Sequence, residues 1–178
     1  MMNKKTSILL AFLFLSIYHL PPVKAFFRNT TEKIWQSDIN ITIATRSDQQ
    51  HRIQLALLLD TSNSMDGLIE QAKSQLWKMV NELAESTKDG RTPEIEIALY
   101  EYGNDQLSPM KGYIREVVPL TSDLDHLSEK LFELNTDGGE EYCGFALKTA
   151  IENLTWSDKA DNLKIVFIAG NEGFDQGP

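Results

Sequence analysis

Apolar residues gather along the chain in segments whose spacing alternates between that of a strand and that of a helix. Apart from Gln54, residues 53–59 are apolar with almost no alternation, which predicts a strand covered on both faces, as in the centre of a parallel sheet. Residues 65–83 carry apolar side chains at helical spacing, and "STKDGRTP" then ends the predicted helix with a glycine and a proline. Residues 95–102 form a second predicted strand, which a helical connection allows to lie parallel to the first.

The later pattern predicts an edge strand, two helices and another buried strand. Only the ten residues "GNDQLSPMKG" precede a third strand at 113–119, too few for a crossover helix, so this strand should run antiparallel at the sheet edge. "SDLDHLSEKLFEL" begins with a Ser/Asp cap and predicts a helix, a second helix is predicted at 145–154, and 163–169 is an apolar strand. The sequence therefore predicts an α/β fold, with a mostly parallel sheet, one antiparallel edge strand and helices on both faces.

The first 25 residues have the pattern of a secretion signal. Lys4 and Lys5 are basic, residues 8–20 are apolar or small, and small residues precede an expected cleavage after Ala25. The apolar run is short for a membrane-spanning helix, which needs about 20 residues. An uncleaved N-terminal anchor is the alternative, and after cleavage we expect no membrane insertion.

Residues 26–51 are interpreted as a polar lead-in with a candidate strand at 39–44, and residues 52–178 as the domain. The net charge is −9, and removal of the three lysines of the signal leaves −12. An acidic exported chain is a poor partner for nucleic acid and fits a secreted or periplasmic role that recruits cations.

The one cysteine, Cys143, excludes an internal disulfide and is interpreted as buried and inert, the alternative being a bond to another chain.

The candidate chemistry lies in "LALLLDTSNSM", where the first strand ends in Asp60, followed by Ser62 and Ser64. In α/β sheets, ligands bind beyond the carboxyl ends of the strands. Alternate residues of this turn can direct a carboxylate and two hydroxyls to one point. These oxygens suit a hard cation such as Mg²⁺, which retains several waters and needs few protein ligands.

The apolar strand, the D-x-S-x-S turn and the long helix together resemble a von Willebrand factor type A (vWA) domain. "EIALYEYGND", "REVVPLTSDLDHLSEKLFEL" and "DGGEEYCGFAL" are similar to later segments of that family, and "KIVFIAGNEGFDQGP" resembles the ending of exported bacterial members. The resemblance covers about residues 50–172. It implies a Rossmann-like fold and a metal-ion-dependent adhesion site for a divalent cation, most often Mg²⁺, with Mn²⁺ or Ca²⁺ as alternatives. It also implies a protein partner whose acidic group completes the site, and no enzymatic activity.

Two positions depart from the family pattern. Glu141 stands where the Gly-Gly loop usually supplies a threonine, and Thr136 is a distant substitute. Gly170 stands where the strand usually ends in an aspartate that binds the ion through water. Three later residues are candidate substitutes for that aspartate: Asn171, Glu172 and Asp175. The resemblance therefore implies four metal ligands: Asp60, Ser62, Ser64 and Glu141.

The competing function is hydrolysis, because "LLLDTS" also resembles the active-site turn of an aspartic protease. There, Asp60 would share a proton with a second aspartate and activate water. Such a turn should lead into β-structure, whereas residues 65–83 are predicted to be helical.

The family's sheet has the strand order 3-2-1-4-5-6, and only the first four strands can be found here. We therefore expect the domain to be incomplete at its C-terminus. The strand at 163–169 would then have an open apolar edge that strands five and six normally cover. A partner chain that adds strands is the alternative.

We expect the exported protein to begin at Phe26, because a basic segment, an apolar segment and small residues precede this position. N-terminal sequencing of the exported protein checks this. A protein that retained Met1 would favour the anchored form.

Overall fold

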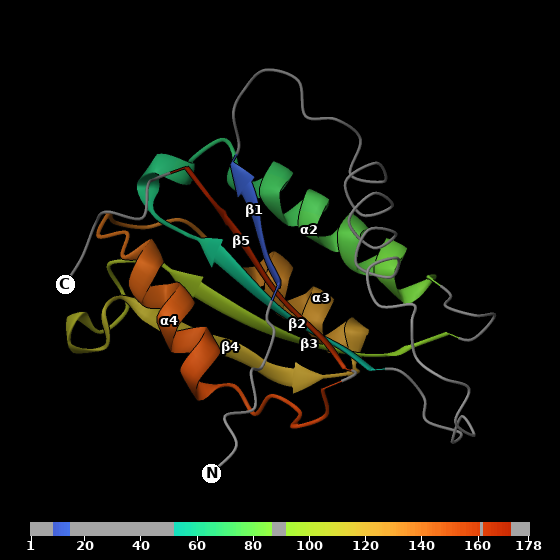
Figure 1. Ribbon diagram of the computed structural model, residues 1–178. Coiled ribbons are helices and arrows are strands. Elements are labelled where there is room, and N and C mark those ends of the chain that lie inside the picture. The colour runs from blue at the N-terminus through green and yellow to red at the C-terminus, as the bar shows by residue number, and fades with distance from the viewer. Residues whose placement is uncertain (1–8, 15–51, 87–91, 161, 172–178) are drawn as a thin grey trace, which may run out of the picture.

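The computed structural model describes residues 9–14, 52–86, 92–160 and 162–171 (Figure 1). The strands and helices follow the predicted alternation, and two 3-10 turns interrupt the loops. The elements in chain order are β1 (Leu9–Phe14), β2 (Arg52–Asp60), η1 (Asn63–Met65), α2 (Ile69–Ala84), β3 (Glu94–Tyr102), η2 (Pro109–Lys111), β4 (Ile114–Thr121), α3 (Leu124–Glu133), α4 (Cys143–Asn153) and β5 (Leu163–Gly170).

The strands form one sheet in the order β1-β5-β2-β3-β4. β2 pairs in parallel with β3 and β5, and β4 pairs antiparallel to β3 at the edge. The predicted sheet, with one antiparallel edge strand, is therefore confirmed. The register places Asp60 opposite Tyr102 and Leu59 opposite Ala169, so the carboxyl ends of β2, β3 and β5 meet.

The centre of the sheet is buried on both faces, as the unbroken apolar pattern predicts. Leu55, Leu57 and Leu59 of β2 belong to one core with α2 and α3, whereas Ala56 and Leu58 belong to a second core with α4. Figure 1 shows α2 and α3 on one side of the sheet and α4 on the other. Each fully buried leucine contributes about 1.5–3 kcal/mol, so these two cores hold the strands in place.

The helix boundaries differ from the prediction in one instructive case. Met65 is fully buried as its spacing predicts, but it belongs to η1, and α2 begins at Ile69. Gly67 lies between them with φ of +78°, a conformation that ends a right-handed helix. The predicted cap of α3 is confirmed, because the Asp123 side chain accepts the N–H of His126 at 3.0 Å.

The far side of β5 is covered by β1, so the expectation of an open edge was wrong for the chain that retains residues 9–14. β1 pairs in parallel with β5, from Leu9 opposite Ile165 to Phe14 opposite Gly170. An unpaired strand presents a row of free backbone donors and acceptors. The apolar run of the predicted secretion signal supplies a segment that pairs with them in the intact chain.

The lead-in at 26–51, with its candidate strand at 39–44, lies outside the described residues. Among the residues that the structure describes, no helix is both long and apolar enough to cross a membrane.

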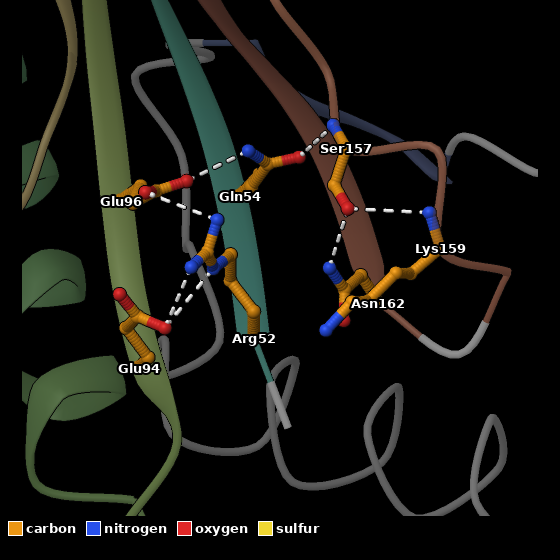
Figure 2. A network of polar contacts seen from close by, with 7 residues as sticks. All are labelled: Arg52, Gln54, Glu94, Glu96, Ser157, Lys159 and Asn162. Atoms are coloured by element: carbon orange, nitrogen blue, oxygen red, sulfur yellow. Dashed lines mark hydrogen bonds and ion pairs between the residues drawn. The ribbon is translucent and has the colours of Figure 1, made fainter. Parts of the chain in front are cut away.

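A polar network joins the amino ends of β2 and β3 to the loop before β5 (Figure 2). Gln54 is 2% exposed, and its Nε2 donates to Glu96 at 2.7 Å while its Oε1 accepts the N–H of Ser157 at 2.7 Å. Arg52 pairs with Glu94 at 2.9 Å and with Glu96 at 3.4 Å. Because the buried amide is bonded at both ends, it adds stability and fixes the loop against the sheet.

Lys73 links α2 to the carboxyl end of α3. The residue is 1% exposed, and its ammonium donates to the carbonyl of Leu134 at 2.5 Å and pairs with Glu70 at 2.7 Å. The last carbonyls of a helix lack intrahelical partners, and a lysine can supply them. Lys73 therefore fixes the point where the chain leaves α3 for the loop before α4.

We expect Lys73→Met to lower the free energy of unfolding by about 2 kcal/mol, because it leaves a buried carbonyl without its charged donor. Urea unfolding followed by circular dichroism measures the change. Lys78→Met, at an exposed position of the same helix, is the matched control and should change the stability by less than about 0.5 kcal/mol. Equal stabilities of the two variants would contradict this role of Lys73.

Candidate metal centre

The turn after β2 is buried at the carboxyl edge of the sheet. Asp60, Thr61 and Ser62 are all 0% exposed. The N–H of Thr61 donates to the carbonyl of Tyr102 at 2.9 Å, which holds the turn against β3. The N–H of Ser62 donates to Oδ1 of Asp60 at 2.9 Å. The remaining polar groups of the turn must find partners within the protein, because burial removes them from water.

Oxygen atoms from three segments gather around Ser64. Its Oγ lies 2.8 Å from Oγ of Ser62 and 3.1 Å from Oε1 of Glu141. It also lies 3.0 Å from Oδ1 of Asn171, whose Nδ2 donates to the carbonyl of Ser64 at 3.1 Å. A hydroxyl has a single hydrogen to donate. Ser64 therefore cannot donate to all these neighbours at once, and the cluster holds more oxygens than hydrogens to share between them.

Two carboxylate oxygens at this edge are buried without any hydrogen bond, Oδ2 of Asp60 and Oε2 of Glu141. Glu141 is 5% exposed, so water does not replace the missing partner. None of the ion pairs among the described residues includes either carboxylate. A buried charge without a partner is costly, and carboxylate and hydroxyl oxygens are the ligands of hard divalent cations. The residues present therefore fit a divalent cation.

Burial also changes the acidity of the site. It raises the pKa of Asp60 to about 6; hydrogen bonds from Ser62 and from the backbone of Asn171 oppose this rise, and the charge of Glu141 adds to it. Burial and the charge of Asp60 raise the pKa of Tyr102 well above its usual range, so that this hydroxyl stays protonated at neutral pH. The site thus disfavours negative charge unless a counterion is present.

The loop between α3 and α4 brings Glu141 to the turn. The N–H of Asn63 donates to the carbonyl of Gly138 at 2.6 Å, and the N–H of Asp137 donates to the carbonyl of Thr61 at 3.0 Å. Gly138 has φ of +78°, and a Cβ there would overlap the side chain of Asp105. Backbone hydrogen bonds and a glycine conformation therefore place this loop against the turn after β2.

Gly170 occupies a space that excludes a side chain. A Cβ there would overlap the hydroxyl of Tyr102 and lie 3.1 Å from Oδ2 of Asp60. An aspartate, which the family resemblance predicts at this position, has no room beside Tyr102. Asn171 instead places its amide oxygen next to Ser64.

The remaining candidate metal ligands are Thr136, Glu172 and Asp175. Thr136 hydrogen-bonds to Asp66 and does not join the oxygen cluster. Glu172 and Asp175 lie outside the described residues. Among the residues described, no three His, Cys, Asp or Glu side chains gather as a ligand group. A cation held here would therefore depend on hydroxyl or amide oxygens in addition to the two carboxylates.

Cys143 is buried, as predicted. Burial raises the pKa of its thiol to about 11, although a hydrogen bond with Tyr102 opposes the rise. The thiol therefore stays protonated at neutral pH, as an inert residue of the core does.

Comparisons with known proteins agree with the fold. The model of the von Willebrand factor type A domain family matches residues 54–176. The chain is similar to the proximal thread matrix protein 1 of the mussel byssus, with 16% identity over 72% of this chain and 33% of that chain and a TM-score of 0.52. It is also similar to the PilB minor pilin of Streptococcus sanguinis, with 17% identity over 69% of this chain and 30% of that chain and a TM-score of 0.51.

A third similar structure is the pilus adhesin SpaC of Lactobacillus rhamnosus GG, with 15% identity over 69% of this chain and 15% of that chain and a TM-score of 0.50. The chain thus spans between 15% and 33% of the length of these three proteins. Among curated proteins, none matches the chain. Because the family model matches well over half of the sequence, from residue 54 to residue 176, the chain belongs to the von Willebrand factor type A domain family.

Proposed function

We propose that this chain is an exported binding module that holds a divalent cation and, through the cation, binds a protein partner. Asp60, Ser62, Ser64 and Glu141 are its ligands, and Asn171 stands beside them. The observation that carries the proposal is the pair of buried carboxylate oxygens without hydrogen-bond partners, next to two serine hydroxyls that have fewer hydrogens than there are neighbouring acceptor oxygens. A divalent cation would supply the missing positive charge in one step.

The oxygens around Ser64 lie close enough together to share one small cation, and we propose Mg²⁺ or the similar Mn²⁺. Adjacent oxygens around an octahedral Mg²⁺, each at about 2.0–2.1 Å from the ion, stand about 2.9 Å apart. The separations around Ser64 are 2.8, 3.0 and 3.1 Å. Ca²⁺ holds its oxygens at about 2.3–2.6 Å and usually recruits about six to eight of them, more than the four ligands proposed here.

The partner would approach from the solvent side of Ser64 and Asn171, which are both exposed. An acidic group from the partner is the natural complement to a cation left partly open by the protein, and the cation would screen it from a chain whose net charge is −9. The similarity to a minor pilin and a pilus adhesin supports a protein-binding role outside the cytoplasm.

The structure gives no support to the hydrolase alternative. The turn at Asp60 leads into η1 and α2, whereas a protease turn should lead into β-structure. The acid whose charge acts on Asp60 is Glu141, whereas the protease mechanism requires a second aspartate.

We expect Mg²⁺ to raise the melting temperature of the wild-type chain and to leave that of Asp60→Ala unchanged. Ligand linkage predicts a stabilisation of about 2.7 kcal/mol at a Mg²⁺ concentration a hundredfold above the dissociation constant. Differential scanning calorimetry with and without Mg²⁺ measures it. Asp158→Ala, an exposed acid in the loop before β5, is the control and should respond like the wild type. A full Mg²⁺ response in Asp60→Ala would rule out this site.

The metal-free protein should lose stability as the pH rises from about 4 to about 6. Asp60 has a pKa of 3.8 when unfolded and about 6 when folded, so the folded state binds the extra proton and is favoured below this window. The loss is at most about 3 kcal/mol. Urea unfolding in the presence of a chelator, at several pH values, measures it. Asp60→Asn should remove this part of the pH dependence, and identical pH profiles for the two proteins would contradict it.

A further inference from the structure

We propose that Glu141 is an internal acidic ligand, which gives the site its cation without help from a partner and competes with the partner's acidic group for the same ion. This inference rests on the proposed function, because it concerns how that cation site is controlled. An acidic partner would therefore bind this cation more weakly than it would bind a cation held without Glu141.

The position of Glu141 differs from that of an ordinary loop acid. Glu140, its neighbour, is exposed, whereas Glu141 is 5% exposed. Its Oε1 accepts from Ser64 at 3.1 Å, and its Oε2 is buried without a partner. The loop that carries it is bonded to the turn after β2 by the backbone of Asn63 and Gly138. Glu141 is therefore held where its carboxylate meets the oxygen cluster.

A purely structural role does not account for this carboxylate. α4 begins at Cys143, and neither a side-chain cap nor an acidic residue in its first turn is present. No described basic side chain pairs with Glu141. Gly103 leaves space between the two acids, because a Cβ there would lie 2.8 Å from Oδ1 of Asp60 and 3.3 Å from Cγ of Glu141. Asp60 and Glu141 therefore border the same space, and no basic side chain among the described residues pairs with either acid.

The competition between Glu141 and a partner's carboxylate follows from the balance of charge at the site. Asp60 and Glu141 together carry two negative charges when ionised, which neutralise a divalent cation. A further carboxylate from a partner would then leave the site with an excess negative charge, on a chain that already has a net charge of −9. Without Glu141, one positive charge remains on the cation, and an acidic group from outside is attracted.

Glu141→Gln should therefore weaken the binding of the cation alone and create a dependence on added carboxylate. It keeps the size of the side chain and removes its charge. We expect the dissociation constant for Mn²⁺ to rise about tenfold or more in this variant. Saturating acetate, as a probe for a carboxylate ligand, should then improve Mn²⁺ binding severalfold, whereas it should change the wild type by less than about twofold.

The experiment is a calorimetric titration of Mn²⁺ into the full chain, with and without acetate. The proteins are the wild type, Glu141→Gln, and the matched control Glu140→Gln, which loses the same charge from an exposed neighbour and should behave as the wild type. Glu141→Thr, which supplies a hydroxyl without charge, is titrated in parallel and gives the same comparison if Glu141→Gln does not melt cooperatively.

The two proposals fail in different ways. If the wild type binds Mn²⁺ and Glu141→Gln binds it equally tightly with no response to acetate, the role of Glu141 is overturned while the cation site stands. If Glu140→Gln shows the same weakening as Glu141→Gln, a general loss of charge explains the effect and the inference is also overturned. If neither the wild type nor any variant binds Mn²⁺, the proposed cation site fails, and the inference fails with it.

Discussion

The rest of the structure depends on one constraint, which is the burial of the Asp60 carboxylate at the end of an apolar strand. Asp60 is 0% exposed, and its Oδ2 has no hydrogen-bond partner. Such a group destabilises the fold when it is ionised, unless a proton or a cation neutralises it. The parallel sheet creates this position, because β3 and β5 flank β2 and end beside it. The loops around the carboxyl edge are therefore arranged about a carboxylate that they satisfy at Oδ1 and leave without a partner at Oδ2.

Much of the fold could be predicted from the sequence because burial and connection length leave clear patterns. β2 and β5 are covered on both faces and are therefore apolar over most of their length, and the short connection before β4 permits only an antiparallel neighbour. The start of α2 could not be predicted from the same pattern. Apolar spacing indicates that Met65 is buried, but it does not indicate the backbone angles of Gly67, which separate η1 from α2. β1 was missed because an apolar run in a secretion signal and an apolar edge strand have the same composition.

The arrangement of the candidate site could likewise be predicted only in part. Asp60, Ser62 and Ser64 lie in one short turn, so their proximity follows from the chain itself. Glu141 could be placed only by counting along a loop, and its contact with Ser64 depends on how backbone hydrogen bonds seat that loop. The contact of Asn171 with Ser64 depends on packing between strands that are distant in sequence, which no local pattern reports.

The two departures from the family pattern are explained by one rearrangement of charge. Tyr102 fills the space beside Gly170, so the end of β5 cannot carry an acid close to Asp60. Glu141 brings a carboxylate from the opposite loop, and its Oε1 lies 3.1 Å from the hydroxyl of Ser64. The edge of the sheet therefore still has two acids. The second acid is Glu141, which contacts the oxygen cluster, and not an aspartate at position 170, which the resemblance associates with water-mediated binding. A charge so placed would act directly on the proposed cation, because the attraction between two charges rises as their distance and the intervening solvent decrease. In the proposed site, a single side chain would therefore link cation affinity to partner chemistry, whereas the fold around it follows the general pattern of the family.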